Sequence, residues 1–239
     1  MARFSPTFLV LFGGVFLPES MAASRFSRLI RFMTTLSVMI PLVSCSLNQS
    51  QTLLDAARTT VSRQSWPRWS DCRSEYGDPT KITDGVAHAN PVWEKANLVM
   101  VRLPWRAHAA WDKDLTIRSL QVHRLAAPSL QRALAAIWLR VGQSQAEIDR
   151  LGLSSIGGGY NWRPVRNGAQ LSTHAYGCAV DFDPDRNALG NHQPNFAAPQ
   201  NRYVIEAFRS EGWIWGGKWP TPDGMHFQAA RVTDDITAF

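Results

Sequence analysis

The chain has 239 residues, 45% of them hydrophobic, and a formal net charge of +6. This length and apolar content suffice for one sizeable core, with an appendage at most. Part of the positive charge lies in the first 44 residues, and no RNP, zinc-finger or helix-turn-helix pattern is present, so nucleic-acid binding is not expected. A mildly basic chain is compatible with an anionic substrate. The ten tryptophans indicate an aromatic-rich core or a groove for an extended ligand.

Residues 1–45 have the features of a targeting segment. From Met21 the chain has arginines, then an apolar stretch, then small residues before Cys45, so Met21 is a second candidate for the start. This ending is similar to a bacterial lipoprotein signal, in which the cysteine receives lipid. The alternative is an uncleaved membrane anchor, although the apolar run is short for a spanning helix of roughly 20 residues. In both cases we expect an exported protein of the periplasm or cell envelope, anchored to the membrane at its N-terminus.

Export affects the interpretation of the other two cysteines. If Cys45 carries lipid, Cys72 and Cys178 remain, and two cysteines in an oxidising compartment can pair. A Cys72–Cys178 disulfide and two buried free thiols are the two alternatives that the sequence leaves open.

Residues 46–65 are polar and are expected to be a tether to a domain that covers residues 66–239. Residues 66–115 are rich in proline and tryptophan, which favours irregular chain around a core, with a short strand near 98–103. Next, apolar residues recur at helical spacing between Pro128 and Gly142 and predict a helix: Leu130, Leu134, Ile137, Trp138 and Val141.

A shorter helix is predicted over 145–151, because Ser144 precedes it as a cap and Gly152 follows it. Residues 154–183 alternate turns with short strands, and a last helix is predicted over 202–210. This mixture predicts a single α+β domain in which helices pack on a small, mostly antiparallel sheet.

His174 and Asp181 are separated by a segment that contains Gly177. Donor atoms on one tetrahedral metal ion lie about 3–4 Å apart. The segment would span roughly 23 Å as a strand and would rise about 10 Å as a helix. The two side chains can share an ion only if the chain turns between them, and Gly177 permits that turn.

The C-terminal stretch "TPDGMHFQ" adds Asp223 and His226. Two histidines and one carboxylate, with a fourth position open to water, are typical of a catalytic zinc site rather than a structural one. The sequence therefore predicts one zinc ion held by His174, Asp181 and His226. Water on such an ion can lose a proton near neutral pH, and Asp223 is the expected general base.

These residues form a pattern, Ser172-x-His174-x-x-Gly177-x-Ala179-x-Asp181 followed by Asp223-x-x-His226. The pattern resembles the zinc D-alanyl-D-alanine carboxypeptidase and L-alanyl-D-glutamate peptidase family over roughly residues 115–230. The resemblance implies a hedgehog/DD-peptidase fold and a peptidase that cuts the peptide stems of bacterial peptidoglycan, as a carboxypeptidase or an endopeptidase. It also implies the same zinc ligands and the same base. Many members have Glu where this chain has Asp223.

The stretch 158–168 ("GGYNWRPVRNG") resembles the family's segment ahead of the zinc motif, where an arginine assists the transition state. Arg163 is the better match and Arg166 the alternative. A guanidinium there would stabilise the oxyanion or hold a substrate carboxylate. Ser172 either binds the backbone or orients a ligand, and Tyr160 is a candidate for the border of the substrate site. The tryptophans of residues 212–220 form an aromatic wall beside the zinc or pack in the core.

The alternative function is a non-catalytic peptidoglycan-binding lipoprotein that retains the zinc site. Binding alone does not require Asp223, so the presence of this acid favours the enzyme.

Overall fold

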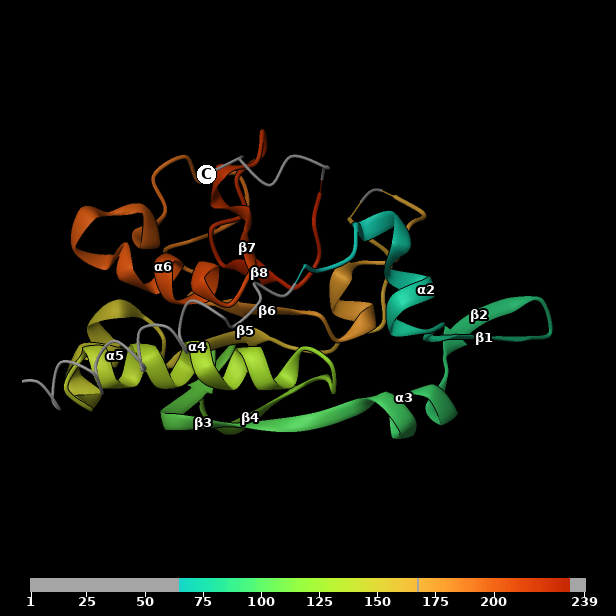
Figure 1. Cartoon of the computed structure of the whole chain (residues 1–239), viewed down its shortest axis with the longest axis horizontal. Coiled ribbons are helices and arrows are strands. Elements are labelled where there is room, and N and C mark those ends of the chain that lie inside the picture. Colours follow the sequence, from blue (N-terminus) through green and yellow to red (C-terminus); the bar gives the residue numbers. More distant parts are fainter. Residues whose placement is uncertain (1–64, 167, 233–239) are drawn as a thin grey trace, which may run out of the picture. The chain divides into compact units, whose positions relative to one another are not determined.

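The computed structural model describes residues 65–166 and 168–232 (Figure 1). Its centre is a sheet with the strand order β4-β3-β5-β6-β8-β7, in which only the β3–β5 pair is parallel. The predicted α+β class with a mostly antiparallel sheet is confirmed. The strands are β3 (Leu98–Ala109), β4 (Asp112–His123), β5 (Ser155–Gly158), β6 (Ala179–Phe182), β7 (Ile214–Trp215) and β8 (His226–Gln228).

Three helices lie where the sequence predicts them: α4 (Ala127–Arg140), α5 (Gln145–Leu151) and α6 (Tyr203–Ser210). Helix α4 buries its apolar stripe against β3 and α6. The Ser144 hydroxyl caps α5 by accepting a hydrogen bond from the backbone N–H of Glu147 at 3.3 Å, and Gly152 ends this helix with a φ of 87°.

Residues 66–115 are more regular than expected. They contain the helices η1 (Trp69–Asp71), α2 (Cys72–Tyr76) and α3 (Pro91–Asn97), and an exposed hairpin of β1 (Thr80–Thr83) and β2 (Val86–Ala89). Strand β3 has 12 residues rather than the short stretch predicted at 98–103. Pro104 does not interrupt it, because the pairing with β4 shifts register between Arg102 and Ala107, and a proline is tolerated at such a bulge.

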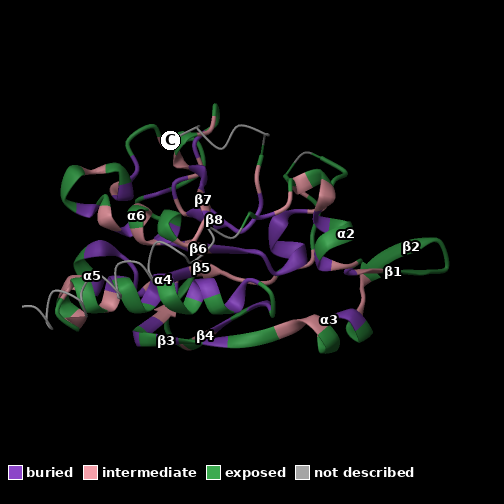
Figure 2. Ribbon diagram, viewed as in Figure 1, coloured by how far each residue is buried: buried purple, intermediate pink, exposed green. Residues whose placement is uncertain are grey.

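The core lies between the sheet and the helices α4 and α6, where Figure 2 shows continuous buried segments. The rings of Phe208 and Phe227 stack there with their centroids 4.1 Å apart. The first described residues close against the last ones, since the Tyr76 hydroxyl donates to the carbonyl of Ala229 at 2.6 Å and the backbone N–H of Arg231 donates to Pro67 at 2.8 Å.

Cys72 and Cys178 are two buried free thiols in the structure, and they do not form a disulfide there. The Cys178 thiol donates to the carbonyl of Thr173 at 3.3 Å. Burial raises the pKa of Cys178, and the adjacent Cys72 adds to this effect.

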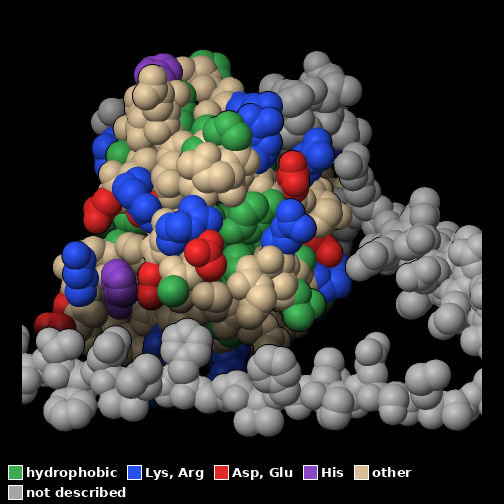
Figure 3. Space-filling view, turned by 90° about the vertical axis from the view of Figure 1, so that its left-hand side faces the viewer, with side chains coloured by type: hydrophobic (Ala, Val, Ile, Leu, Met, Phe, Trp, Pro, Cys, Tyr) green, Lys and Arg blue, Asp and Glu red, His purple; other side chains and the backbone are tan. Residues whose placement is uncertain are grey.

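The predicted signal segment with Cys45, and the tether as far as residue 64, lie outside the described residues. Within the described ranges, no helix is both long and apolar enough to cross a membrane. On the face drawn in Figure 3, lysine and arginine side chains are interspersed with acidic ones rather than gathered into one patch.

Candidate metal centre

The turn predicted around Gly177 is present. Ser172 caps the N-terminus of the helix η2 (Thr173–Tyr176), because its hydroxyl accepts a hydrogen bond from the backbone N–H of His174 at 3.3 Å. The helix ends at Gly177, which has a φ of 66°. A Cβ at this position would lie 2.7 Å from the backbone nitrogen of His123, so the position requires glycine for both its conformation and its space.

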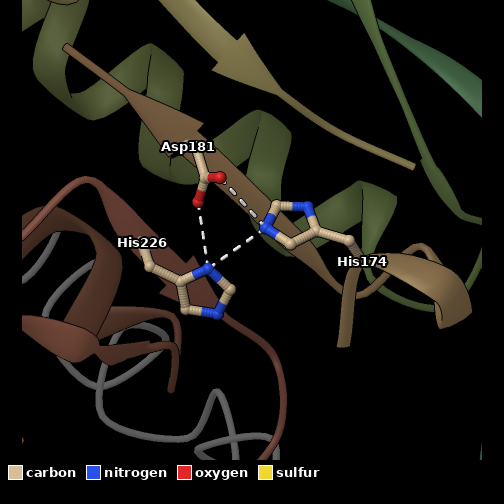
Figure 4. A group of neighbouring side chains, drawn as sticks. All are labelled: His174, Asp181 and His226. Atoms are coloured by element: carbon tan, nitrogen blue, oxygen red, sulfur yellow. Dashed lines mark hydrogen bonds and ion pairs between the residues drawn. The ribbon is translucent and has the colours of Figure 1, made fainter. Parts of the chain in front are cut away.

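Strand pairing brings the two motifs together. Strands β6 and β8 are antiparallel neighbours, and Asp181 pairs directly with His226 in their register. Their side chains therefore point to the same face. The η2 turn places His174 beside them, and Figure 4 shows all three side chains converging on one point.

The donor atoms of these three residues have the spacing of a metal site. His174 Nε2 lies 3.1 Å from an oxygen of Asp181, His226 Nδ1 lies 2.9 Å from the other oxygen, and the two ring nitrogens are 3.2 Å apart. Ligands about 2 Å from one tetrahedral ion are separated by about 3–4 Å. The three donor atoms all lie within 4.8 Å of one another, so among the described residues this group could hold a metal ion.

The hydrogen bonds on the far edges of both rings support this reading. His174 Nδ1 is 2.7 Å from the carbonyl of Gly159, so Nδ1 carries the proton and Nε2 keeps its lone pair. His226 Nε2 is 3.0 Å from Gln228 Oε1. The amide of Gln228 donates from Nε2 to Ala230 at 2.7 Å, which turns Oε1 toward the ring. Two lone pairs and a carboxylate thus face one another, and a bound cation would satisfy all three.

The charges of the site act strongly on one another. Burial alone raises the pKa of Asp181, but the two histidines hold its pKa well below the usual carboxyl range. Burial alone lowers the pKa of His226, but the hydrogen bond and charge of Asp181 raise its pKa above the ordinary value. A proton and a metal ion therefore compete for Nδ1 of His226.

Asp223 lies in the same hollow as the three ligand candidates. Its backbone N–H donates to Gly216 at 2.9 Å. Its Oδ1 is buried and has no hydrogen-bond partner among the described residues. Burial raises the pKa of this carboxyl, while the His226 charge opposes the shift. A buried oxygen without a partner is costly, so this atom is suited to accept a proton from a bound molecule.

The hollow around this group, here called the main hollow, has a volume of about 670 Å³. The predicted residues Arg163, Arg166 and Ser172 line it. The Ser172 hydroxyl already caps η2. Tyr160 is not in the main hollow, and its hydroxyl donates to Glu94 at 2.5 Å. Of the tryptophans in 212–220, Trp219 lines the main hollow with its ring 5.5 Å from that of His226, whereas the other two are in the core, namely Trp213 and Trp215.

Sequence reasoning did not identify Gln228 or the carbonyl of Gly159. The signal for Gln228 was present, because residues two apart in a strand share a face, so Gln228 accompanies His226. The Gly159 carbonyl carries no side-chain signal.

A family model described as D-alanyl-D-alanine carboxypeptidase matches residues 166–229. The matched residues include His174, Asp181, Asp223 and His226. The match supports a peptidase of that family, with a His/Asp/His group that could hold a metal ion. Comparisons with curated proteins and with solved structures found no match.

Proposed function

We propose that this chain is an exported zinc peptidase that hydrolyses the peptide stems of bacterial peptidoglycan. The family match supports D-alanine-containing cell-wall peptides as substrates. The observation that carries the proposal is the convergence of two histidine lone pairs and the Asp181 carboxylate beside the unpartnered Oδ1 of Asp223.

The residues have distinct tasks. His174, Asp181 and His226 would hold one zinc ion, which supplies Lewis acidity and makes water a stronger acid near neutral pH. Asp223 Oδ1 accepts a proton from the attacking water. The new C–O bond forms first and places negative charge on the carbonyl oxygen. The amide C–N bond then breaks as the charge returns to the carbonyl and Asp223 delivers the proton to the departing amine. Arg163 is exposed beside the ligands and stabilises negative charge on the carbonyl oxygen.

The first experiment incubates the purified full chain with muropeptides after chelator dialysis, with and without added zinc, and identifies products by mass spectrometry. We expect zinc-dependent hydrolysis by the wild type. Asp223→Asn should still bind zinc but lose turnover by a factor of about 10²–10⁴. Stoichiometric zinc binding without any new product would overturn the enzyme and favour the non-catalytic binding lipoprotein, which would be indifferent to Asp223→Asn.

A further inference from the structure

A second hollow adjoins the metal centre on the side opposite the main hollow. It has a volume of about 320 Å³ and shares Arg163, His174 and Asp181 with the main hollow. The rest of its lining comes from other elements: Trp111, residues 117 and 119–121 of β4, and residues 156–161.

The strand order shows that the two hollows flank the metal centre. Asp181 is on β6, with β8 on one side and β5, β3 and β4 on the other. The main hollow is lined from the β8 side, by His226 and Gln228. The second hollow is lined from the β5 and β4 side, by Gly158 and Gln121. A ligand that occupies both would therefore cross the strands and pass over the three ligand candidates.

The chemistry of the second hollow suits a peptide. Beyond the three shared residues, its lining carries no charged side chain. The side chains of Ser119, Gln121 and Asn161 make no hydrogen bond to another described residue. They are neutral donors and acceptors of the kind that pair with amide groups.

The wall and rim of the second hollow are also open to a ligand. At Gly158 an added Cβ would meet nothing within 4 Å, so the backbone is bare at that point of the wall. Trp111, at the rim, is 69% exposed although it is a large apolar side chain. Exposed tryptophans of this kind contribute binding energy when a ligand covers them.

We propose that the second hollow binds the part of a peptide stem on one side of the scissile bond while the main hollow binds the part on the other side. This rests on the proposed function and deepens it, because it makes the enzyme an endopeptidase that hydrolyses an internal bond. Removal of a single terminal residue needs room for only that residue on one side, whereas both hollows here are within the size range of ligand pockets.

The test uses the zinc-loaded full chain and a synthetic stem pentapeptide, together with versions shortened by one residue from either end. We expect cleavage at an internal bond, with kcat/KM falling when either end is shortened. Trp111→Ala should lower kcat/KM on the full peptide by roughly three- to tenfold. It should have little effect on the peptide whose shortened end no longer reaches Trp111.

Leu139→Ala is the matched control, because Leu139 is 67% exposed and lines neither hollow. It should behave as the wild type on every peptide, and zinc content and circular dichroism should be equal for all variants. Release of only a terminal residue, or an equal effect of Trp111→Ala on all peptides, overturns the inference while the peptidase stands. Hydrolysis of none of the peptides overturns both.

Discussion

At the scale of single residues, the candidate metal centre depends on what holds the outer edges of the imidazole rings. His226 Nε2 faces Gln228 Oε1, which also accepts from the Thr173 hydroxyl at 3.2 Å. Partners of this kind fix the tautomer and orientation of a ligand histidine. Gln228 is 2% exposed, so water cannot easily replace it. It acts as a positioning residue for His226.

Gln228→Leu should therefore weaken zinc binding by about 10–100-fold. Leucine removes the acceptor for the Nε2 proton, and His226 loses the bond that presents Nδ1 to the metal. Competition with a chromophoric chelator measures the affinity. Gln228→Glu retains an acceptor oxygen and is expected to keep most of the affinity. Equal zinc affinity in Gln228→Leu and wild type would show that strand pairing alone orients the ring.

The pH dependence of hydrolysis should reflect Asp223. A general base must be ionised, and burial raises the pKa of this carboxyl above its ordinary value of 3.8. The rate should therefore fall as the pH is lowered through the raised pKa, at a higher pH than for an ordinary aspartate. The measurement is kcat against pH, with zinc content determined at each pH because protons also compete for His226. If the residual kcat of Asp223→Asn falls at low pH in the same way as the kcat of the wild type, a group other than Asp223 causes that fall.

At the scale of elements, the decisive feature is the turn between His174 and β6. Gly177 has a φ of 66° and faces the backbone of His123, whereas Gly142, after α4, has a φ of 62° and open space around it. The two positions share the left-handed conformation and differ in their surroundings. They allow the cost of conformation to be separated from the cost of crowding.

Gly142→Ala should lower the free energy of unfolding by about 1–2 kcal/mol, the cost of a left-handed conformation. Gly177→Ala should cost about 1–3 kcal/mol more, because the new Cβ would lie 2.7 Å from the His123 backbone nitrogen. Urea denaturation measures both. In Gly177→Ala the turn should also shift, and zinc binding should weaken as a result. Gly142→Ala should leave zinc binding unchanged. Equal losses of stability in the two variants would mean that the His123 segment moves aside at no cost.

At the scale of the whole molecule, the N-terminal part of the described chain packs against the segment that carries His174, one of the three candidate metal ligands. Helix α2 contacts η2, which carries His174. Cys72 and Cys178 are both fully buried where these segments meet. The two thiols are neighbours that burial protects from reagents.

Non-reducing peptide mapping of the native protein should therefore find Cys72 and Cys178 in separate peptides. An alkylating reagent should modify them only after unfolding, because both are 0% exposed in the structure. Mass spectrometry of the alkylated peptides makes the measurement. A single peptide pair joined through both cysteines would instead show that the protein oxidises them after export.

Local patterns determined much of this protein. The periodic apolar residues of α4, the Ser144 cap of α5 and the glycine turn before β6 each depend on neighbours in the chain, so the sequence predicted them. The sequence also predicted that His174, Asp181 and His226 belong to one group, and the structure places their donor atoms together. Zinc as the metal and Asp223 as the base stay predictions from residue type and spacing.

Tertiary structure alone decided the rest. The length of β3 depends on a bulge that accommodates Pro104 and on pairing with β4, neither of which a local pattern reveals. The β6–β8 register brings Asp181 beside His226, and the order of the strands places a hollow on each side of them. Pairing between strands distant in sequence depends on which surfaces are buried together, so these features emerge only when the chain is folded.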